Sequence, residues 1–149
     1  MNTNETIKAT GQLNIKITAA DGTVKHDETV KNLVVTTGLG FIASRMKDAT
    51  ATAMSHMAIG AGSTAAAAGQ TALVTESARV ALTSTTVTAN QVAYVATFPA
   101  GTPASLTAIT EAGLFNASSA GTMLCRTVFA AVNKDVNDTM SITWTVTIS

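Results

Sequence analysis

The sequence predicts a mainly β protein, an antiparallel β-sandwich with one or two short helices, built as a single domain of 149 residues. Three observations favour this fold. Short stretches alternate between apolar and polar side chains, turn residues separate them, and threonine, which suits strands, is abundant. Apolar residues form 46% of the chain and charged residues 12%, which is the reverse of a disordered chain.

The N-terminal part predicts a hairpin. Residues 12–19 alternate between apolar and polar side chains, and residues 23–35 return as a second strand. Asp21 and Gly22 between them are a strong hairpin signal. The whole chain, 1–149, is thus expected to hold an extended arm, a hairpin and a larger region: residues 1–10, 11–35 and 36–149.

The segment after the hairpin carries a helical pattern. Apolar residues and one arginine fall at helical spacing within residues 38–47, which predicts a short helix. Residues 54–59 are typical of a short strand, and residues 60–69 of a loop of small side chains. Residues 72–78 are expected to form a helical turn.

The second half consists of predicted strands. The clearest is the last, where Met140, Ile142, Trp144, Val146 and Ile148 alternate with serine and threonine, so that Trp144 faces the core. Ala89 and Asn90 predict a tight turn between two other strands. The predicted strands are residues 80–88, 91–98, 106–115, 122–132 and 140–148.

Charge and hydropathy exclude several classes of function. Nine basic and nine acidic residues are interspersed, so no basic face is expected for nucleic acid. No apolar run approaches the about 20 residues that span a bilayer. The first residues lack the pattern of a signal peptide, so we expect synthesis in the cytoplasm without membrane insertion.

The sequence predicts no enzyme, metal site or cofactor. His26 and His56 have no Cys or Asp at ligand spacing. Ser55 next to His56 would point to the opposite face of a strand, and Cys125 is expected to be a buried strand residue. The loop with Gly60-x-Gly62 lacks the Lys and Ser/Thr of a phosphate-binding loop, which favours a flexible connection.

Four charged residues stand out as structural. Glu111 and Arg126 are the only charges between residues 80 and 133, both in apolar predicted strands. Glu76 and Arg79 precede them at a helical pair spacing. Buried charges are usually paired, so we expect one or two ion pairs that fix the loop against the sheet. A carboxylate active site is the alternative, disfavoured because no second acid lies near Glu111.

Four motifs in a fixed order resemble a phage domain, the tail-collar fibre module found at the N-termini of tail fibres and in small stand-alone virion proteins. The resemblance covers about residues 32–149. The first to fourth motifs are residues 32–38 (Asn-Leu-Val-Val-Thr-x-Gly), 57–62 (Met-Ala-Ile-Gly-x-Gly), 71–79 (Thr-Ala-Leu-x-x-Glu-x-x-Arg) and 109–115 (Ile-Thr-Glu-Ala-Gly-Leu-Phe).

The resemblance implies a non-enzymatic structural virion component. The fibres continue into a shaft and a receptor-binding tip, whereas this chain stops at Ser149 after a predicted strand, so we expect a tail-associated fibre, collar or adaptor piece. A capsid decoration protein is the alternative, and a carbohydrate-binding module is a remote one. The implied partners are copies of the chain itself, as a homotrimer or other cyclic oligomer, and other virion proteins. The polar arm of residues 1–10 is expected to order against such a neighbour.

Overall fold

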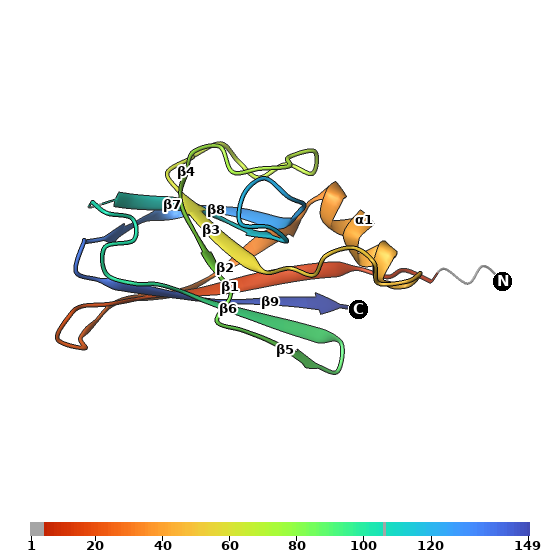
Figure 1. The fold of residues 1–149 in the computed structure, drawn as a ribbon, viewed down its shortest axis with the longest axis horizontal. Coiled ribbons are helices and arrows are strands. Elements are labelled where there is room, and N and C mark those ends of the chain that lie inside the picture. The colour runs from red at the N-terminus through yellow and green to blue at the C-terminus, as the bar shows by residue number, and fades with distance from the viewer. Residues whose placement is uncertain (1–4, 106) are drawn as a thin grey trace.

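A computed structural model describes residues 5–105 and 107–149, and these form nine strands and one helix (Figure 1). Every strand pairing is antiparallel, which confirms a mainly β fold with a short helix. In chain order the elements are β1 (Ala9–Thr18), β2 (Val24–Val34), α1 (Thr36–Arg45), β3 (His56–Gly60), β4 (Glu76–Ala81), β5 (Ser84–Thr88), β6 (Gln91–Phe98), β7 (Thr107–Phe115), β8 (Met123–Lys134) and β9 (Thr139–Ile148).

The described strands belong to one hydrogen-bonded sheet in the order β4-β3-β7-β8-β2-β1-β9-β6-β5. A sandwich of two separate sheets is therefore not confirmed. Strand β2 joins the two halves, because its residues up to Asn32 pair with β1 while Leu33 and Val34 pair with β8. The sheet curls, and Figure 1 shows β7 and β8 on the opposite side of the molecule from β9 and β6.

The main core lies inside this curl. It receives Leu13 and Ile15 from β1, Trp144 from β9, and Met57 and Leu114 from the other half of the sheet. All are fully buried, because alternate residues of each strand point inward. Trp144 faces the core as the alternation of the last strand predicts.

The predicted strand over residues 80–88 is in fact two strands, β4 and β5. The break falls where the chain changes neighbours: Leu82 N donates to Ser55 O at 2.8 Å, and Thr83 N donates to Val95 O at 2.7 Å. These acceptors lie in opposite halves of the sheet, so the chain crosses between the halves at this point. No local pattern in the sequence marks such a crossing.

Two other boundaries differ from the predictions. Residues 72–78 form no helical turn, because β4 already begins at Glu76. Strand β1 begins at Ala9, and Lys8 and Ser149 exchange backbone hydrogen bonds of 2.6 and 2.8 Å, so the end of the expected arm belongs to the sheet. Residues 1–4 of that arm and Leu106, the predicted start of a strand, lie outside the described residues. Within the described part, α1 is the sole helix and is too short to cross a membrane.

The tight turn between β5 and β6 offers a test of the hairpin. Ala89 has a φ of 52°, a left-handed value that favours glycine. We expect Ala89→Gly to raise the free energy of unfolding by about 0.5–1 kcal/mol, measured by urea denaturation. Ala81→Gly, at an exposed residue of β4 without a positive φ, should instead lower it. Equal destabilisation by both changes would contradict this account of the turn.

Candidate functional site

The structure pairs the four charged residues singled out in the sequence. Glu111 and Arg126 form an ion pair of 2.7 Å in which both side chains are fully buried. Glu76 and Arg79 form a second pair of 2.7 Å, with side chains 34% and 7% exposed. The two pairs share their chemistry and differ in burial, which makes them a natural comparison.

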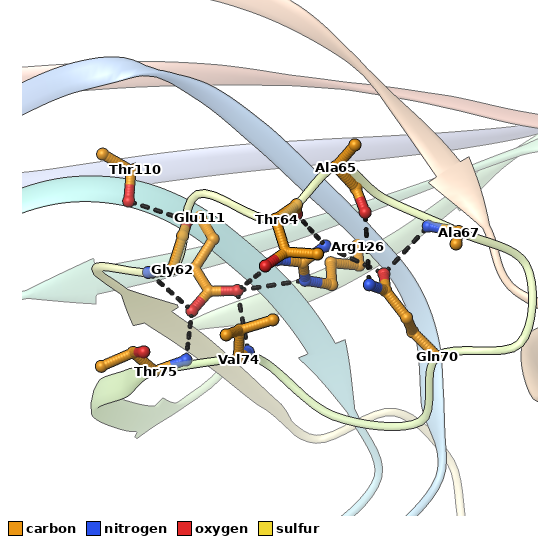
Figure 2. Close-up of polar contacts among 10 residues, drawn as sticks. All are labelled: Gly62, Thr64, Ala65, Ala67, Gln70, Val74, Thr75, Thr110, Glu111 and Arg126. Atoms are coloured by element: carbon orange, nitrogen blue, oxygen red, sulfur yellow. Dashed lines mark hydrogen bonds and ion pairs between the residues drawn. The ribbon is translucent and has the colours of Figure 1, made fainter.

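The Glu111 carboxylate gathers the donors of a long loop (Figure 2). Its Oε1 accepts hydrogen bonds from the backbone N–H groups of Gly62 and Thr75, at 3.0 and 2.7 Å. Its Oε2 accepts from Val74 N at 3.0 Å and from Arg126 Nε and Nη2 at 3.0 and 2.7 Å. Five donors therefore surround two oxygens, and the buried charge is fully compensated.

Arg126 binds the other part of the same loop. Its Nη1 donates to Thr64 O and to the Gln70 side-chain oxygen, both at 2.9 Å. Gln70 continues the network, because its oxygen also accepts from Ala67 N at 2.9 Å and its amide nitrogen donates to Ala65 O at 3.2 Å. The pair thus holds both arms of the loop over residues 61–75 (Figure 2).

The strand register explains why the two charges meet. Arg126 of β8 is paired with Gly113 of β7, and Glu111 is paired with Val128. Glu111 and Arg126 are therefore diagonal neighbours, a spacing that long side chains can reach across. Gly113 opposite Arg126 leaves room for Leu73, which would collide with a larger residue there.

The hydrogen bonds lower the pKa of Glu111. Burial by itself raises this pKa, but the bonds from Thr75 N, Arg126 and Val74 N outweigh burial and hold it below the usual 4.5. The carboxylate therefore stays ionised at neutral pH. With every acceptor position occupied by the protein, its role is to hold the loop.

The Gly60-x-Gly62 motif is the place where the loop meets this carboxylate. A Cβ at Gly62 would overlap the Glu111 carboxylate, and one at Gly60 would overlap Thr75 O. The backbone N–H of Gly62 does bind an anion, but the anion is the chain's own Glu111. The flexible connection expected from the sequence is in fact a pinned loop.

The outer pair fixes a second loop. Arg79 donates from Nε and Nη2 to Glu76 at 2.9 and 2.7 Å, and from Nη1 to Ala117 O and Ala120 O at 3.0 Å each. Its guanidinium lies 3.8 Å from the centre of the Phe115 ring, a cation–π contact.

The spacing of Glu76 and Arg79 predicted a helix, yet both lie on strand β4. The register of β4 against β3 shifts between Ala78 and Glu76, which is a β-bulge. A bulge interrupts the alternation of faces, so residues three apart can point to the same side. The pairing was therefore foreseeable, but the element that carries it was not.

The other candidate residues do not assemble into a reactive site. Ser55 Oγ lies 2.8 Å from His56 Nδ1, so the expectation that these side chains point apart is wrong, because Ser55 precedes β3 and is free of its alternation. His26 lies 3.2 Å from Glu28. Cys125 is buried, and burial raises the pKa of its thiol. Among the described residues, no three His, Cys, Asp or Glu side chains are placed to hold a metal.

A further charge cluster at the β8–β9 turn was missed from the sequence. Lys25 Nζ lies 2.6 Å from Asp138 and 3.2 Å from Asp135. Lys134 is 1% exposed and donates to Pro99 O at 3.1 Å. Burial lowers the pKa of Lys134, while the charge of Asp138 acts in the opposite direction. In the sequence, Lys134 stands among other charged residues near a turn, and nothing in that pattern predicts that it is buried.

The four motifs of the phage resemblance converge in the structure. A second apolar cluster contains Val35, Ala58, Leu73, Phe115 and Met123. The first four of these come from the first, second, third and fourth motifs, one from each. Gly60 and Gly62 of the second motif lie against Glu111 of the fourth motif in the loop anchor beside this cluster. The motifs therefore describe one structural unit, in which a loop is held against strands β3, β7 and β8.

The fold and the site together define a small, mainly β protein in which the longest described loop is anchored by a buried ion pair. Comparison of the chain with protein-family models, curated proteins and solved structures found no match.

The two ion pairs predict unequal sensitivity to mutation. Glu111→Gln leaves Arg126 as an unpaired buried charge, so we expect the free energy of unfolding to fall by about 3–5 kcal/mol. The matched control, Glu76→Gln, breaks the more exposed pair and should lower it by about 1 kcal/mol or less. Urea denaturation at pH 7 measures both. Similar losses for the two variants would show that burial does not decide the strength of these pairs.

The lowered pKa of Glu111 predicts a pH dependence. Because the folded pKa lies below the unfolded value, the stabilisation is complete above the usual 4.5 and is lost as pH falls through the folded pKa. The difference in stability between the wild type and Glu111→Gln should therefore be largest at neutral pH and should narrow on acidification. Asp21, Asp48 and Asp138 also have lowered pKa values, but they are common to both proteins and cancel. A difference that stays constant down to acid pH would contradict the assignment.

Proposed function

We propose that the chain is a non-enzymatic structural component of a tailed-phage virion, a tail-associated fibre, collar or adaptor protein that associates with itself and docks onto the particle. One observation carries the proposal. Each of the four motifs on which the phage resemblance rests contributes a residue to one apolar cluster, and the second, third and fourth also contribute hydrogen-bonding groups to the anchor of Glu111. Glu111 and Arg126, which a binding or catalytic site would expose, are buried here and hold a loop against the sheet. A stable scaffold of this kind is what a virion component requires.

The surface of the chain supports a docking role. The net charge is zero, so copies held at high local concentration do not repel one another through a net charge. Strand β5 at the sheet edge is exposed along its length and uncharged. Exposed strand edges bind further strands by backbone hydrogen bonds, a common way to join subunits.

The alternatives differ in how well they fit. A capsid decoration protein would use the same rigid scaffold, and location on the particle separates it from a tail component. A carbohydrate-binding module fits less well, because sugar rings stack on exposed aromatic side chains. Trp144 and Phe98 are fully buried, and the remaining aromatic residues are also largely covered: Tyr94, Phe115 and Phe129 are buried and Phe41 is half-buried.

Labelling of assembled particles tests the proposal. The hairpin tip is exposed and a side chain at Gly22 would meet open space, so a peptide tag inserted there should leave the fold intact. We expect an antibody to the tag to mark the tail of purified phage particles in electron micrographs, in a small and regular number of copies. Particles carrying the untagged chain are the control. Label over the whole head would support the decoration alternative, and unlabelled particles from cells that make the tagged chain would overturn the proposal.

A further inference from the structure

Strand β5 is an unprotected edge of the sheet. It is the last strand in the sheet order, and all five of its residues, Ser84 to Thr88, are exposed. Proteins usually protect an exposed edge with charged residues, proline or a bulge, because its free backbone groups attract other strands. The sequence Ser-Thr-Thr-Val-Thr contains no charged residue and no proline.

The opposite edge of the sheet has such protection. Strand β4 contains the register shift next to Glu76 and carries the Glu76–Arg79 ion pair. Arg79 also reaches across to the carbonyl groups of Ala117 and Ala120. The two edges of one sheet thus differ, and β5 is the edge left open for a neighbour.

The register identifies the backbone groups that β5 leaves unpaired. Asn90 O accepts from Ile148 N at 2.9 Å, so Asn90 faces β9, whereas Val95 O accepts from Thr83 N at 2.7 Å, so Val95 faces β5. Residues 91, 93 and 95 of β6 therefore face β5, and their partners in β5 are residues 88, 86 and 84. The N–H and C=O groups of Thr85 and Val87 consequently point outward from the sheet.

The side chains of Thr85 and Val87 lie beside an apolar cleft. Both line a cleft of about 310 Å³ together with Tyr94, Phe41 of α1 and other apolar side chains. Val87 is 70% exposed at this rim. Its partial coverage by a neighbour would remove apolar surface from water, which is favourable. Outward backbone groups and an exposed valine on the same two residues specify an extended strand as the occupant.

We propose that the occupant is β5 of a second copy of this chain, paired antiparallel about Thr86. This inference deepens the self-association in the proposed function and rests on that part of it. Antiparallel pairing about Thr86 sets Thr85 opposite Val87 of the second copy, and Val87 opposite Thr85. These are the residues with outward backbone groups, so both pairs can exchange N–H···O bonds in each direction, giving four bonds in all.

The strand can pair with a copy of itself in register and without charge repulsion, because it carries no charged side chain. Thr86 meets Thr86 of the second copy as the close pair between the two hydrogen-bonded pairs, and threonine pairs of this kind are favourable. No like charges are brought together. The contact is isologous, so it closes as a twofold dimer and joins two sheets into one.

The contact is small. A strand of five residues spans about 17 Å, which is short for a standard protein interface of about 1,600 Å². We therefore expect weak association in free solution and stronger association where the particle holds copies side by side.

Substituting Thr86 by a charged residue tests both the contact at the β5 edge and its register. Thr86→Lys places two like charges directly opposite each other, and we expect it to weaken dimerisation by about tenfold or more in sedimentation equilibrium at protein concentrations up to about 1 mM. Thr86→Glu should do the same. An equimolar mixture of the two variants should restore dimers, because only the mixed pair sets opposite charges face to face. The control is Ser77→Lys on the β4 edge, an exposed position that should leave association unchanged.

Hydrogen exchange provides a second readout that a folding defect would not imitate. The amides of Thr85 and Val87 should exchange more slowly as the wild-type concentration rises, while the amides of Thr86 and Thr88, bonded to β6, should stay protected throughout. In Thr86→Lys, the exchange rates of the Thr85 and Val87 amides should no longer depend on protein concentration, and protection of the amides bonded to β6 should be unchanged.

Three outcomes separate this inference from the proposed function. The β5 contact is overturned if the dimer persists in Thr86→Lys. It is also overturned if amide exchange at Thr85 and Val87 does not depend on protein concentration. Self-association would then have to use another surface. A strict monomer at 1 mM overturns the β5 contact and the self-association together. Attachment to the particle is measured independently by the tag at the hairpin tip.

Discussion

The buried pair of Glu111 and Arg126 is the interaction on which this half of the structure depends. Residues 61–75 form a long connection with no regular structure of its own, a type of segment that is usually mobile in a compact domain. Here it is held at both arms by two side chains of the sheet. Desolvation opposes such a pair, and only the convergence of backbone donors and acceptors on both ions makes burial tolerable. The anchor therefore works as a unit, in which the loop also completes the ion pair.

The anchored loop gives the sheet two unlike ends. At the β4 end, the register shift next to Glu76 and the Glu76–Arg79 pair supply a bulge and charged side chains, which are features that discourage pairing at a sheet edge. At the β5 end, five uncharged residues remain open. Because the chain has few charges and buries Glu111, Arg126, Lys134 and Asp138, threonine supplies much of its polar surface. A surface of this kind favours close packing with neighbours and suits the structural role proposed for the chain.

Particular elements show how far the sequence could predict this arrangement. The hairpin of β1 and β2 and the buried face of β9 follow from alternation and turn residues, which are local properties. The four charged residues could be recognised because isolated charges in apolar strands need partners. The crossing between Leu82 and Thr83 could not be recognised, since both residues continue a strand-like pattern and only their hydrogen-bond partners differ. The bulge next to Glu76 could not be recognised either, because it allows Glu76 and Arg79, which are three residues apart as in a helix, to pair on a strand.

The sequence by itself determined the mainly β class, the inward faces of the clearest strands and the identity of the charges that must be compensated. These depend on side-chain chemistry and on spacing within one segment. The tertiary structure decided which residues meet: that the sheet is continuous through β2, that Glu111 lies diagonal to Arg126, and that Gln70 and the backbone of Gly62 complete their coordination. Such contacts join residues far apart in the chain, and their geometry is set by register and curl, which no local pattern encodes.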